Sequence, residues 1–341
     1  MLIIATISKN SYAPAKIEEI ITAGATILRF IFSHGSPAEM EEHIKIAREV
    51  ITRLKRLDVK ILADLPGAKL RLGRFEPIEL PVKSGQEIIF KSAAESVLPQ
   101  EFIPVNAPEI GLLVQENQEI SLGEGDLSLL VKKIISPDSF QAISLNDGLI
   151  QNMKGFNVGI GVDELNHITT DTLAHIKILP NIKPDLIAVS FVNSAKHLEE
   201  VRGLIKASFG SDQIPPLVAK VETVQGVEKI EEITASADWL MVARGDLALT
   251  APYELLGVYQ KRIIIAAKKA GKPVIVATQI LESLLDKRRP TRSEILDLTN
   301  IVLDGADAIM FAKETGLSLT PGFSVKIAQD IINAVEKNRN S

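Results

Sequence analysis

The sequence contains no cysteine among its 341 residues, and this absence excludes several kinds of chemistry. Disulfides, cysteine-ligated zinc, iron–sulfur clusters and thiol catalysis all require that side chain. Aromatic residues are also scarce, with 11 Phe, 3 Tyr and 1 Trp, and the formal net charge is −5. Proteins that bind nucleic acids usually present a basic surface and aromatic rings for base stacking. We therefore expect no nucleic-acid partner.

Long apolar runs are missing as well. No segment approaches the roughly 20 apolar residues that a membrane-spanning helix needs, so we expect no membrane association. Met1 leads directly into Leu2-Ile3-Ile4, without the charged region or the cleavage site of a signal peptide. These absences predict a cytoplasmic protein.

The sequence does contain eight short runs rich in Ile, Val, Leu and Ala, which begin near Leu2, Thr26, Lys60, Leu186, Pro216, Trp239, Pro273 and Ala308. Such runs are typical of strands buried on both faces of a parallel sheet. Helical patterns lie between them, for example at residues 38–57, 195–208, 225–235, 253–270 and 321–338, and Thr291 with Glu294 predicts a capping box. Eight strands that alternate with helices predict an α/β fold of the (β/α)8 (TIM) barrel type, and an open doubly wound sheet is the alternative.

Residues 72–155 interrupt this alternation. They carry short alternating stretches such as EIIF and EISL, separated by turns that contain Pro, Gly and Ser. The tripeptide Asn146-Asp147-Gly148 between two such stretches predicts a β-hairpin. Without residues 72–155, the chain keeps 257 of its 341 residues, close to the roughly 250 typical of a (β/α)8 barrel. We therefore predict a catalytic barrel formed by residues 1–71 and 156–341, and a small antiparallel β-domain, residues 72–155, inserted after the third strand.

Polar residues stand where several of these strands end, and the active sites of such barrels lie at that edge. Lys220 and Glu222 follow Val218 at every second position, which places all three on the inward face of one strand. Glu222 and Asp246 offer two carboxylates, the ligand type that Mg²⁺ prefers. With a lysine and an arginine nearby, this set suits a divalent ion and an anionic substrate.

Six segments, in order along nearly the whole chain, resemble the pyruvate kinase family. They are ILRFIFSHG (27–35), AKVETVQGV (219–227), MVARGDLAL (241–249), GKPVIVATQILES (271–283), RRPTRSE (288–294) and VLDGADAIMFAKET (302–315). The resemblance implies a barrel with a β lid after strand three, and an enzyme that transfers the phosphoryl group of phosphoenolpyruvate to ADP, giving pyruvate and ATP. Its partners would be phosphoenolpyruvate, pyruvate, ADP and ATP.

The resemblance also implies roles for individual residues. Glu222 and Asp246 would ligate Mg²⁺ or Mn²⁺, while Lys220 and Arg29 would contact the transferring phosphoryl group. Thr278 would lie near the enolate carbon that gains a proton. The backbone amides of Gly245 and Asp246 would bind the substrate carboxylate, and the nucleotide would be contacted by His34, Arg71 and Lys154.

Several positions depart from the family pattern. Ser33 and Asp64 of the monovalent-cation region remain, but Ile31 replaces an asparagine, and Lys69 stands where K⁺-dependent members carry a glutamate. An ammonium group at Lys69 can supply the charge of K⁺, so we expect no K⁺ requirement. The sequence ends shortly after the last barrel helix, which predicts a short form without the family's C-terminal effector domain.

Other departures concern the nucleotide side, where Gly123-Glu124-Gly125 replaces the usual Asp-Asp-Gly of the lid. Two alternative functions therefore stay open. One is a metal-dependent aldolase or lyase that acts on 2-oxo acids with the same carboxylates. The other is a non-catalytic sensor that binds phosphoenolpyruvate. We also expect homo-oligomers that associate through barrel helices.

Overall fold

The structure is a computed structural model that describes residues 1–96, 101–123, 125–158 and 168–338. The chain divides into two compact units. The barrel unit comprises Met1–Gly67, His167–Leu247 and Glu254–Ser341, and the insert unit comprises Ala68–Asn166 and Ala248–Tyr253.

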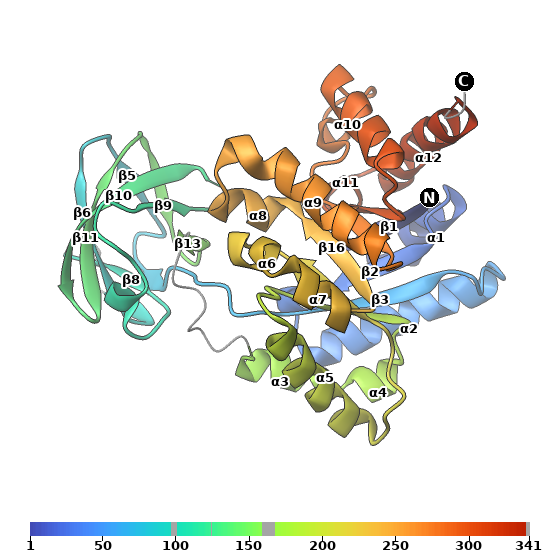
Figure 1. The fold of residues 1–341 in the computed structure, drawn as a ribbon, viewed down its shortest axis with the longest axis horizontal. Coiled ribbons are helices and arrows are strands. Elements are labelled where there is room, and N and C mark those ends of the chain that lie inside the picture. The colour runs from blue at the N-terminus through green and yellow to red at the C-terminus, as the bar shows by residue number, and fades with distance from the viewer. Residues whose placement is uncertain (97–100, 124, 159–167, 339–341) are drawn as a thin grey trace. The chain divides into compact units, whose positions relative to one another are not determined.

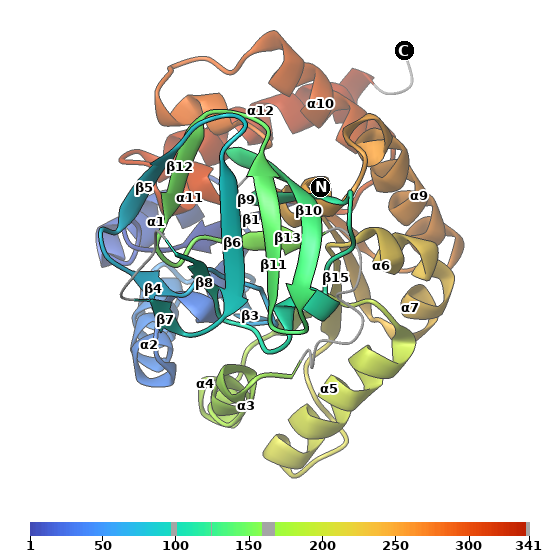
Figure 2. The same cartoon turned by 90° about the vertical axis from the view of Figure 1, so that its left-hand side faces the viewer.

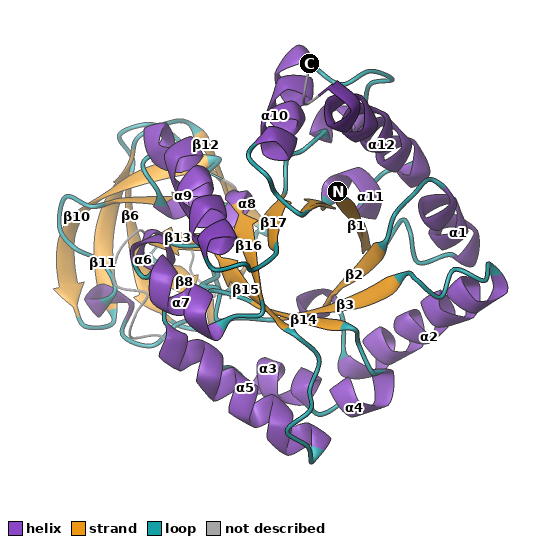
Figure 3. Ribbon diagram, turned by 45° about the vertical axis from the view of Figure 1, so that its right-hand side comes forward, coloured by secondary structure: helices purple, strands orange, loops and turns teal. Residues whose placement is uncertain are grey.

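Eight parallel strands close a barrel in the order β1, β18, β17, β16, β15, β14, β3, β2 (Figure 3). Their bounds are β1 Leu2–Ile7, β2 Ile27–Ile31, β3 Lys60–Leu65, β14 Leu186–Val189, β15 Leu217–Val221, β16 Trp239–Ala243, β17 Val274–Ala277 and β18 Ala308–Phe311. These are the eight strands that the apolar runs predict. Because β1 pairs with β18, the sheet has no free edge, so the predicted (β/α)8 barrel is confirmed and the open-sheet alternative is wrong.

Alternate residues of the strands fill the barrel interior. Every strand contributes to one buried cluster, which includes Ile4, Ile27, Leu62, Ala188, Val218, Met241, Ile275 and Met310. Two residues further along their strands, the same inward faces carry polar side chains, among them Thr6, Arg29, Asp64, Ser190 and Lys220. The apolar packing therefore ends where the polar cluster begins, at the C-terminal edge of the barrel.

Helices follow the strands, and the longer ones lie around the outer side of the barrel (Figures 1 and 3). The helices are α1 Pro14–Thr22, α2 Pro37–Arg53, α3 Thr170–Ile176, α4 Leu179–Ile182, α5 Ala195–Phe209, α6 Val224–Glu228, α7 Ile230–Ser236, α8 Arg244–Thr250, α9 Leu256–Lys269, α10 Arg292–Leu303, α11 Lys313–Gly316 and α12 Pro321–Asn338. The single helix predicted over 225–235 is divided into α6 and α7, because Lys229 leaves helical geometry (φ −97°, ψ 22°). The helix predicted from residue 253 begins with the 3₁₀ turn Tyr253–Leu255.

The insert unit is built from short strands (Figure 2). One six-stranded sheet has the order β13-β9-β10-β11-β6-β8, and β12 pairs with β5 and β4 with β7 in two smaller sheets. The bounds are β4 Arg74–Phe75, β5 Glu79–Val82, β6 Glu87–Ser92, β7 Glu95–Ser96, β8 Ile103–Val105, β9 Glu119–Leu122, β10 Leu127–Ser136, β11 Ser139–Ser144, β12 Gly148–Gln151 and β13 Phe156–Val158. Most pairs are antiparallel, and the rings of Phe90, Phe140 and Phe156 pack together in a core of its own.

The hairpin predicted at Asn146-Asp147-Gly148 is wrong. This turn leads from β11 to β12, but β12 pairs with β5. The side chains of the turn explain the difference, because they bind other segments. Asn146 Oδ1 accepts a hydrogen bond from the Ser128 amide (2.9 Å), and Asp147 accepts one from the Ser84 amide (2.9 Å). The chain is thus directed into the smaller sheet, and β11 forms its hairpin with β10 instead.

Candidate active site

A chain of buried ion pairs crosses the C-terminal edge of the barrel, with Asp64 of β3 at its centre. Arg29 of β2 donates from Nε to Asp64 Oδ2 (2.7 Å), and Lys220 of β15 donates from Nζ to Asp64 Oδ1 (3.1 Å). Burial alone would raise the pKa of Asp64, but the charges of Lys220 and Arg29 outweigh it and hold this pKa below its ordinary value. Asp64 is therefore a fixed anion that orients two cations.

Two hydroxyl groups, on Thr6 of β1 and Ser190 at the end of β14, complete the orientation of these cations. Arg29 Nη1 donates to Thr6 Oγ1 (3.0 Å), and Lys220 Nζ donates to Ser190 Oγ (2.8 Å). The sequence analysis missed both hydroxyls, although the period-2 pattern that placed Lys220 inward also places Thr6 after the inward Ile4 and Ser190 after Ala188.

Lys220 and Glu222 do lie together, as the strand periodicity predicts. Lys220 Nζ is 3.1 Å from Glu222 Oε1, and Glu222 Oε2 accepts a hydrogen bond from the amide of Phe191 (2.6 Å). Burial lowers the pKa of Lys220, but Asp64 and Glu222 more than compensate, so this pKa lies above its ordinary value. The ammonium group therefore stays charged at neutral pH.

The pKa of Glu222 is shifted in the opposite direction from that of Asp64. Burial raises the pKa of Glu222 to about 7, the nearby charge of Asp246 adds to the increase, and Lys220 and the Phe191 amide oppose it. Two carboxylates that repel each other in this way are the donor set that a divalent cation neutralises.

The residues fit a metal that takes few protein ligands. Within the described part of the chain, no group of three or more His, Asp or Glu residues could hold an ion on its own. Mg²⁺ commonly uses one or two protein carboxylates, and takes its remaining ligands from water and substrate phosphate groups. Glu222 and Asp246 match that requirement.

Thr278 and Gly245 lie in contact at the ends of β17 and β16. The amide of Gly245 donates to Thr278 Oγ1 (2.9 Å), and a Cβ added at Gly245 would lie 3.4 Å from that oxygen. Gly245 and Asp246 belong to the first turn of α8, as expected for amides that bind a carboxylate. In this structure, however, the Gly245 amide is bound to the threonine hydroxyl.

The predicted nucleotide-binding residues, together with Ser33 of the predicted monovalent-cation region, fall in both units. Ser33 and His34 are exposed in the 3₁₀ turn Phe32–His34 of the barrel unit. In the insert unit, Arg71 Nη1 donates to the carbonyl of Met153 (3.3 Å), and the carbonyl of Lys154 accepts from the Leu72 amide (2.9 Å).

Lys69 also belongs to the insert unit, where its Cε is 3.3 Å from the position of a Cβ added at Gly155. Of the altered lid tripeptide, Gly123 and Gly125 have positive φ angles, of 70° and 94°. Glu124 lies outside the described residues.

Among the described helices, none combines the length and the apolar character needed to cross a membrane. Residues 1–325 match the family model "Pyruvate kinase, barrel domain". A pyruvate kinase of Thermococcus litoralis is 32% identical over 99% of this chain, which covers 70% of that relative.

Two bacterial relatives give the same result. A pyruvate kinase of Thermotoga maritima is 32% identical over 98% of the chain, which spans 71% of its length. One of Staphylococcus aureus is 34% identical over 98% of the chain, which spans only 56% of its length. The order of the motifs, the closed barrel and these matches agree, and the chain belongs to the pyruvate kinase family.

Proposed function

We propose that this protein transfers the phosphoryl group of phosphoenolpyruvate to ADP. The bond between phosphorus and the enolate oxygen breaks, and a bond forms from phosphorus to a terminal oxygen of ADP. The released enolate takes up a proton at carbon and becomes pyruvate. Phosphoryl transfer depends on positioned cations more than on covalent chemistry. The observation that carries the proposal is Lys220, a buried ammonium group held by Asp64, Ser190 and Glu222 at the C-terminal edge of the barrel.

Lys220 and Arg29 would stabilise the negative charge on the transferring phosphoryl group. Asp64 contacts both cations, and a hydroxyl group accepts one further hydrogen bond from each of them. Because these contacts exist before a substrate arrives, little reorganisation is needed during the reaction, which is the basis of electrostatic catalysis.

Glu222 and Asp246 would hold Mg²⁺, or Mn²⁺ in its place. When bound, the ion supplies positive charge to the phosphate oxygens and orients them. Glu222 is prepared for this role, because the amide of Phe191 and the ammonium group of Lys220 direct its two oxygens. Its pKa of about 7 means that it must lose a proton before it can act as a ligand.

The substrate carboxylate would bind the amides of Gly245 and Asp246. Since the Gly245 amide donates to Thr278 Oγ1 in this structure, the arriving carboxylate would replace the threonine as its acceptor. This exchange would free the Thr278 hydroxyl to take part in protonation of the enolate carbon.

On the nucleotide side, we propose that His34, Arg71 and Lys154 bind ADP and that Lys69 replaces K⁺. Both oxygens of Asp64 already accept hydrogen bonds from cationic side chains, which supports an enzyme without a K⁺ requirement. The inserted domain, residues 72–155, would act as a lid. We further propose a cytoplasmic homo-oligomer that has no nucleic-acid or membrane partner.

The test is pyruvate formation from phosphoenolpyruvate and ADP with Mg²⁺, measured with and without K⁺ at constant ionic strength. We expect turnover that does not depend on K⁺ and that falls by about 10³-fold in Lys220→Met, since one positioned donor to developing charge is worth roughly 10²–10³ in rate. Lys196→Met is the matched control, because Lys196 is an exposed residue of α5 that forms an ion pair with Glu200.

The alternatives give different results in the same assay. If no nucleoside diphosphate supports turnover while phosphoenolpyruvate and Mg²⁺ still bind, the sensor replaces the kinase. Carbon–carbon cleavage of a 2-oxo acid that depends on Glu222 but not on Lys220 would identify an aldolase or lyase. Strong activation by K⁺ would contradict only the proposed role of Lys69, and not the proposed phosphoryl transfer.

A further inference from the structure

The segment that follows β17 has an unusual backbone. Thr278 and Gln279 have φ angles of +70° and +51°. A positive φ is uncommon for any residue with a side chain, and it is especially unfavourable for β-branched threonine. Such a conformation persists only where the surroundings hold it in place. Two buried side chains, Arg244 and Glu314, hold residues 278–281.

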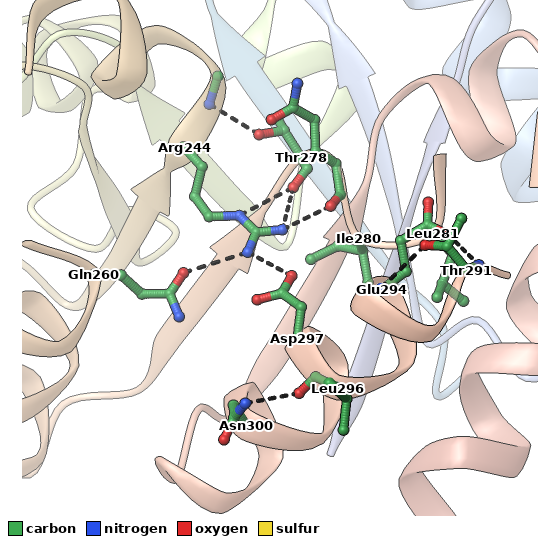
Figure 4. A network of polar contacts seen from close by, with 12 residues as sticks. Arg244, Gln260, Thr278, Ile280, Leu281, Thr291, Glu294, Leu296, Asp297 and Asn300 are labelled. Carbon is green, nitrogen blue, oxygen red and sulfur yellow. Dashed lines mark hydrogen bonds and ion pairs between the residues drawn. The ribbon is translucent and has the colours of Figure 1, made fainter. Parts of the chain in front are cut away.

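Arg244 holds the two carbonyl groups of the segment (Figure 4). Its Nη2 donates to the carbonyl of Thr278 (2.6 Å) and to that of Gln279 (2.9 Å), and its Nε also donates to the Thr278 carbonyl (3.2 Å). The arginine is 7% exposed. A planar guanidinium that contacts two successive carbonyls fixes their direction as well as their position.

The opposite side of this guanidinium is fixed too. Arg244 Nη1 is 2.7 Å from Asp297 Oδ2 of α10 and 3.4 Å from Gln260 Oε1 of α9 (Figure 4). Arg244 is thus anchored to two barrel helices, and it has little freedom to release the carbonyls.

Glu314, at the start of α11, holds the next two amides. Its Oε1 accepts hydrogen bonds from the amides of Ile280 (3.0 Å) and Leu281 (3.3 Å), and its Oε2 accepts one from Ala312 (2.9 Å). Glu314 is 1% exposed. The four residues 278–281 are therefore held by a buried cation at their first two carbonyls and by a buried carboxylate at their last two amides.

We propose that Arg244 and Glu314 are positioning residues for proton transfer, because together they hold the Thr278 backbone in the left-handed conformation that directs its hydroxyl. The proposal rests on the proposed function, in which Thr278 acts at the enolate carbon. Both side chains act through the backbone of residues 278–281. When the substrate carboxylate takes the Gly245 amide away from Thr278 Oγ1, the clamp formed by Arg244 and Glu314 is what keeps the freed hydroxyl in place.

The test separates the two chemical steps. Phosphoryl transfer is followed as ATP formed in a single turnover of phosphoenolpyruvate with ADP. Proton transfer is followed by NMR as the exchange of pyruvate methyl protons in D₂O, in the presence of Mg²⁺ and ATP. In the exchange, a C–H bond breaks, its electrons form the enolate, and the carbon takes a deuteron that derives from the solvent.

We expect Arg244→Lys and Glu314→Gln to slow proton exchange by about 10²-fold, which is the cost of a small misplacement of a reacting group, while ATP formation falls much less. Lysine keeps the charge of Arg244 but cannot contact two carbonyls as a planar fork. Arg262→Lys on α9 is the matched control, because that exposed arginine contacts the carbonyl of Glu228 and lies outside the clamp.

A loss of folded protein would lower both steps equally, so the ratio of the two rates distinguishes positioning from a structural role. If Arg244→Lys lowers both steps by the same factor, or leaves exchange unchanged, the positioning proposal is overturned. If the unmodified protein shows neither ATP formation nor exchange, the proposed function itself fails. Asp297→Asn weakens only the contact that anchors Arg244. It should lower the ratio of proton exchange to ATP formation to a smaller extent, and it replaces the other variants as the test if they do not fold.

Discussion

At the scale of single residues, Asp64 has the widest influence on the candidate site. It is a buried carboxylate that contacts Arg29 and Lys220, which lie on different strands. Without Asp64, two buried cations would repel each other and would lose the hydrogen bonds that orient them. The residue is therefore expected to matter for stability as much as for activity.

We predict that Asp64→Asn lowers the free energy of unfolding by about 3–5 kcal/mol, because a buried ion pair loses one partner. Urea denaturation measures the difference, with the exposed Asp212→Asn as a control expected within about 0.5 kcal/mol of the unmodified protein. The folded-state pKa of Asp64 is lowered, so its contribution is present above the unfolded pKa and is lost as the pH falls through the lower, folded value. The difference in unfolding free energy between the unmodified protein and Asp64→Asn should therefore become smaller at acidic pH. A difference that becomes larger there would contradict this account.

The raised pKa of Glu222 gives a prediction for metal binding. A protonated carboxyl group cannot ligate a metal, so the apparent affinity for Mn²⁺ alone should fall as the pH drops below about 7, by up to about tenfold per unit. Electron paramagnetic resonance of free Mn²⁺ measures this between pH 5.5 and 8.5. The variant Glu222→Gln should bind Mn²⁺ weakly at every pH in this range. An affinity of the unmodified protein that is constant across this range would show that Glu222 is not a ligand.

At the scale of elements, Glu294 links the start of α10 to the 3₁₀ turn Glu282–Leu285. It completes the capping box with Thr291, and it also accepts a hydrogen bond from the amide of Ser283 (2.8 Å). Thr291→Ala should cost about 1 kcal/mol of unfolding free energy, the usual value of a cap. Glu294→Ala should cost more, about 2–3 kcal/mol, because the Ser283 amide also loses its partner. Equal costs in urea denaturation would mean that the link to Ser283 contributes nothing.

The strands of the barrel were predictable from sequence, because buried parallel strands are apolar on both faces and give continuous runs. The inward direction of Lys220 and Glu222 followed from the same period-2 geometry. Turns were harder to predict. The sequence Asn146-Asp147-Gly148 is a common hairpin turn, but its side chains bind Ser128 and Ser84, which are distant along the chain. Local preference cannot anticipate such tertiary contacts.

The candidate site was predictable in its residue types and less so in its contacts. The pairing of Lys220 with Asp64 joins residues 156 positions apart, and nothing local to either indicates it. The positive φ of Thr278 was also not predictable, because threonine disfavours it. The contacts of Arg244 with Asp297 and with the Thr278 carbonyl were not predictable either, since they depend on a backbone conformation that only the folded structure shows.

At the scale of the whole molecule, each of the two units has a buried cluster of its own among the described residues. The insert unit has its own buried cluster around Phe90, Phe140 and Phe156, and the barrel interior forms another. We predict two transitions in differential scanning calorimetry. Mg²⁺ with phosphoenolpyruvate at about 100 times its dissociation constant should add about 2.7 kcal/mol to the barrel transition, because Glu222, Asp246 and Lys220 all belong to the barrel unit. A single cooperative transition would contradict this prediction.

The closure of the barrel by β1 and β18 has a consequence for synthesis on the ribosome. Thr6, which orients Arg29, donates to the carbonyl of Phe311 (2.6 Å), and Thr315 donates to the carbonyl of Thr6 (3.0 Å). The polar contacts of β1, the first strand to be translated, are therefore complete only after β18 and the residues up to Thr315 have been synthesised. A nascent chain that stops before Ala308 has seven of the barrel strands and an open edge. Such a chain is exposed to aggregation until translation delivers the strand that closes it.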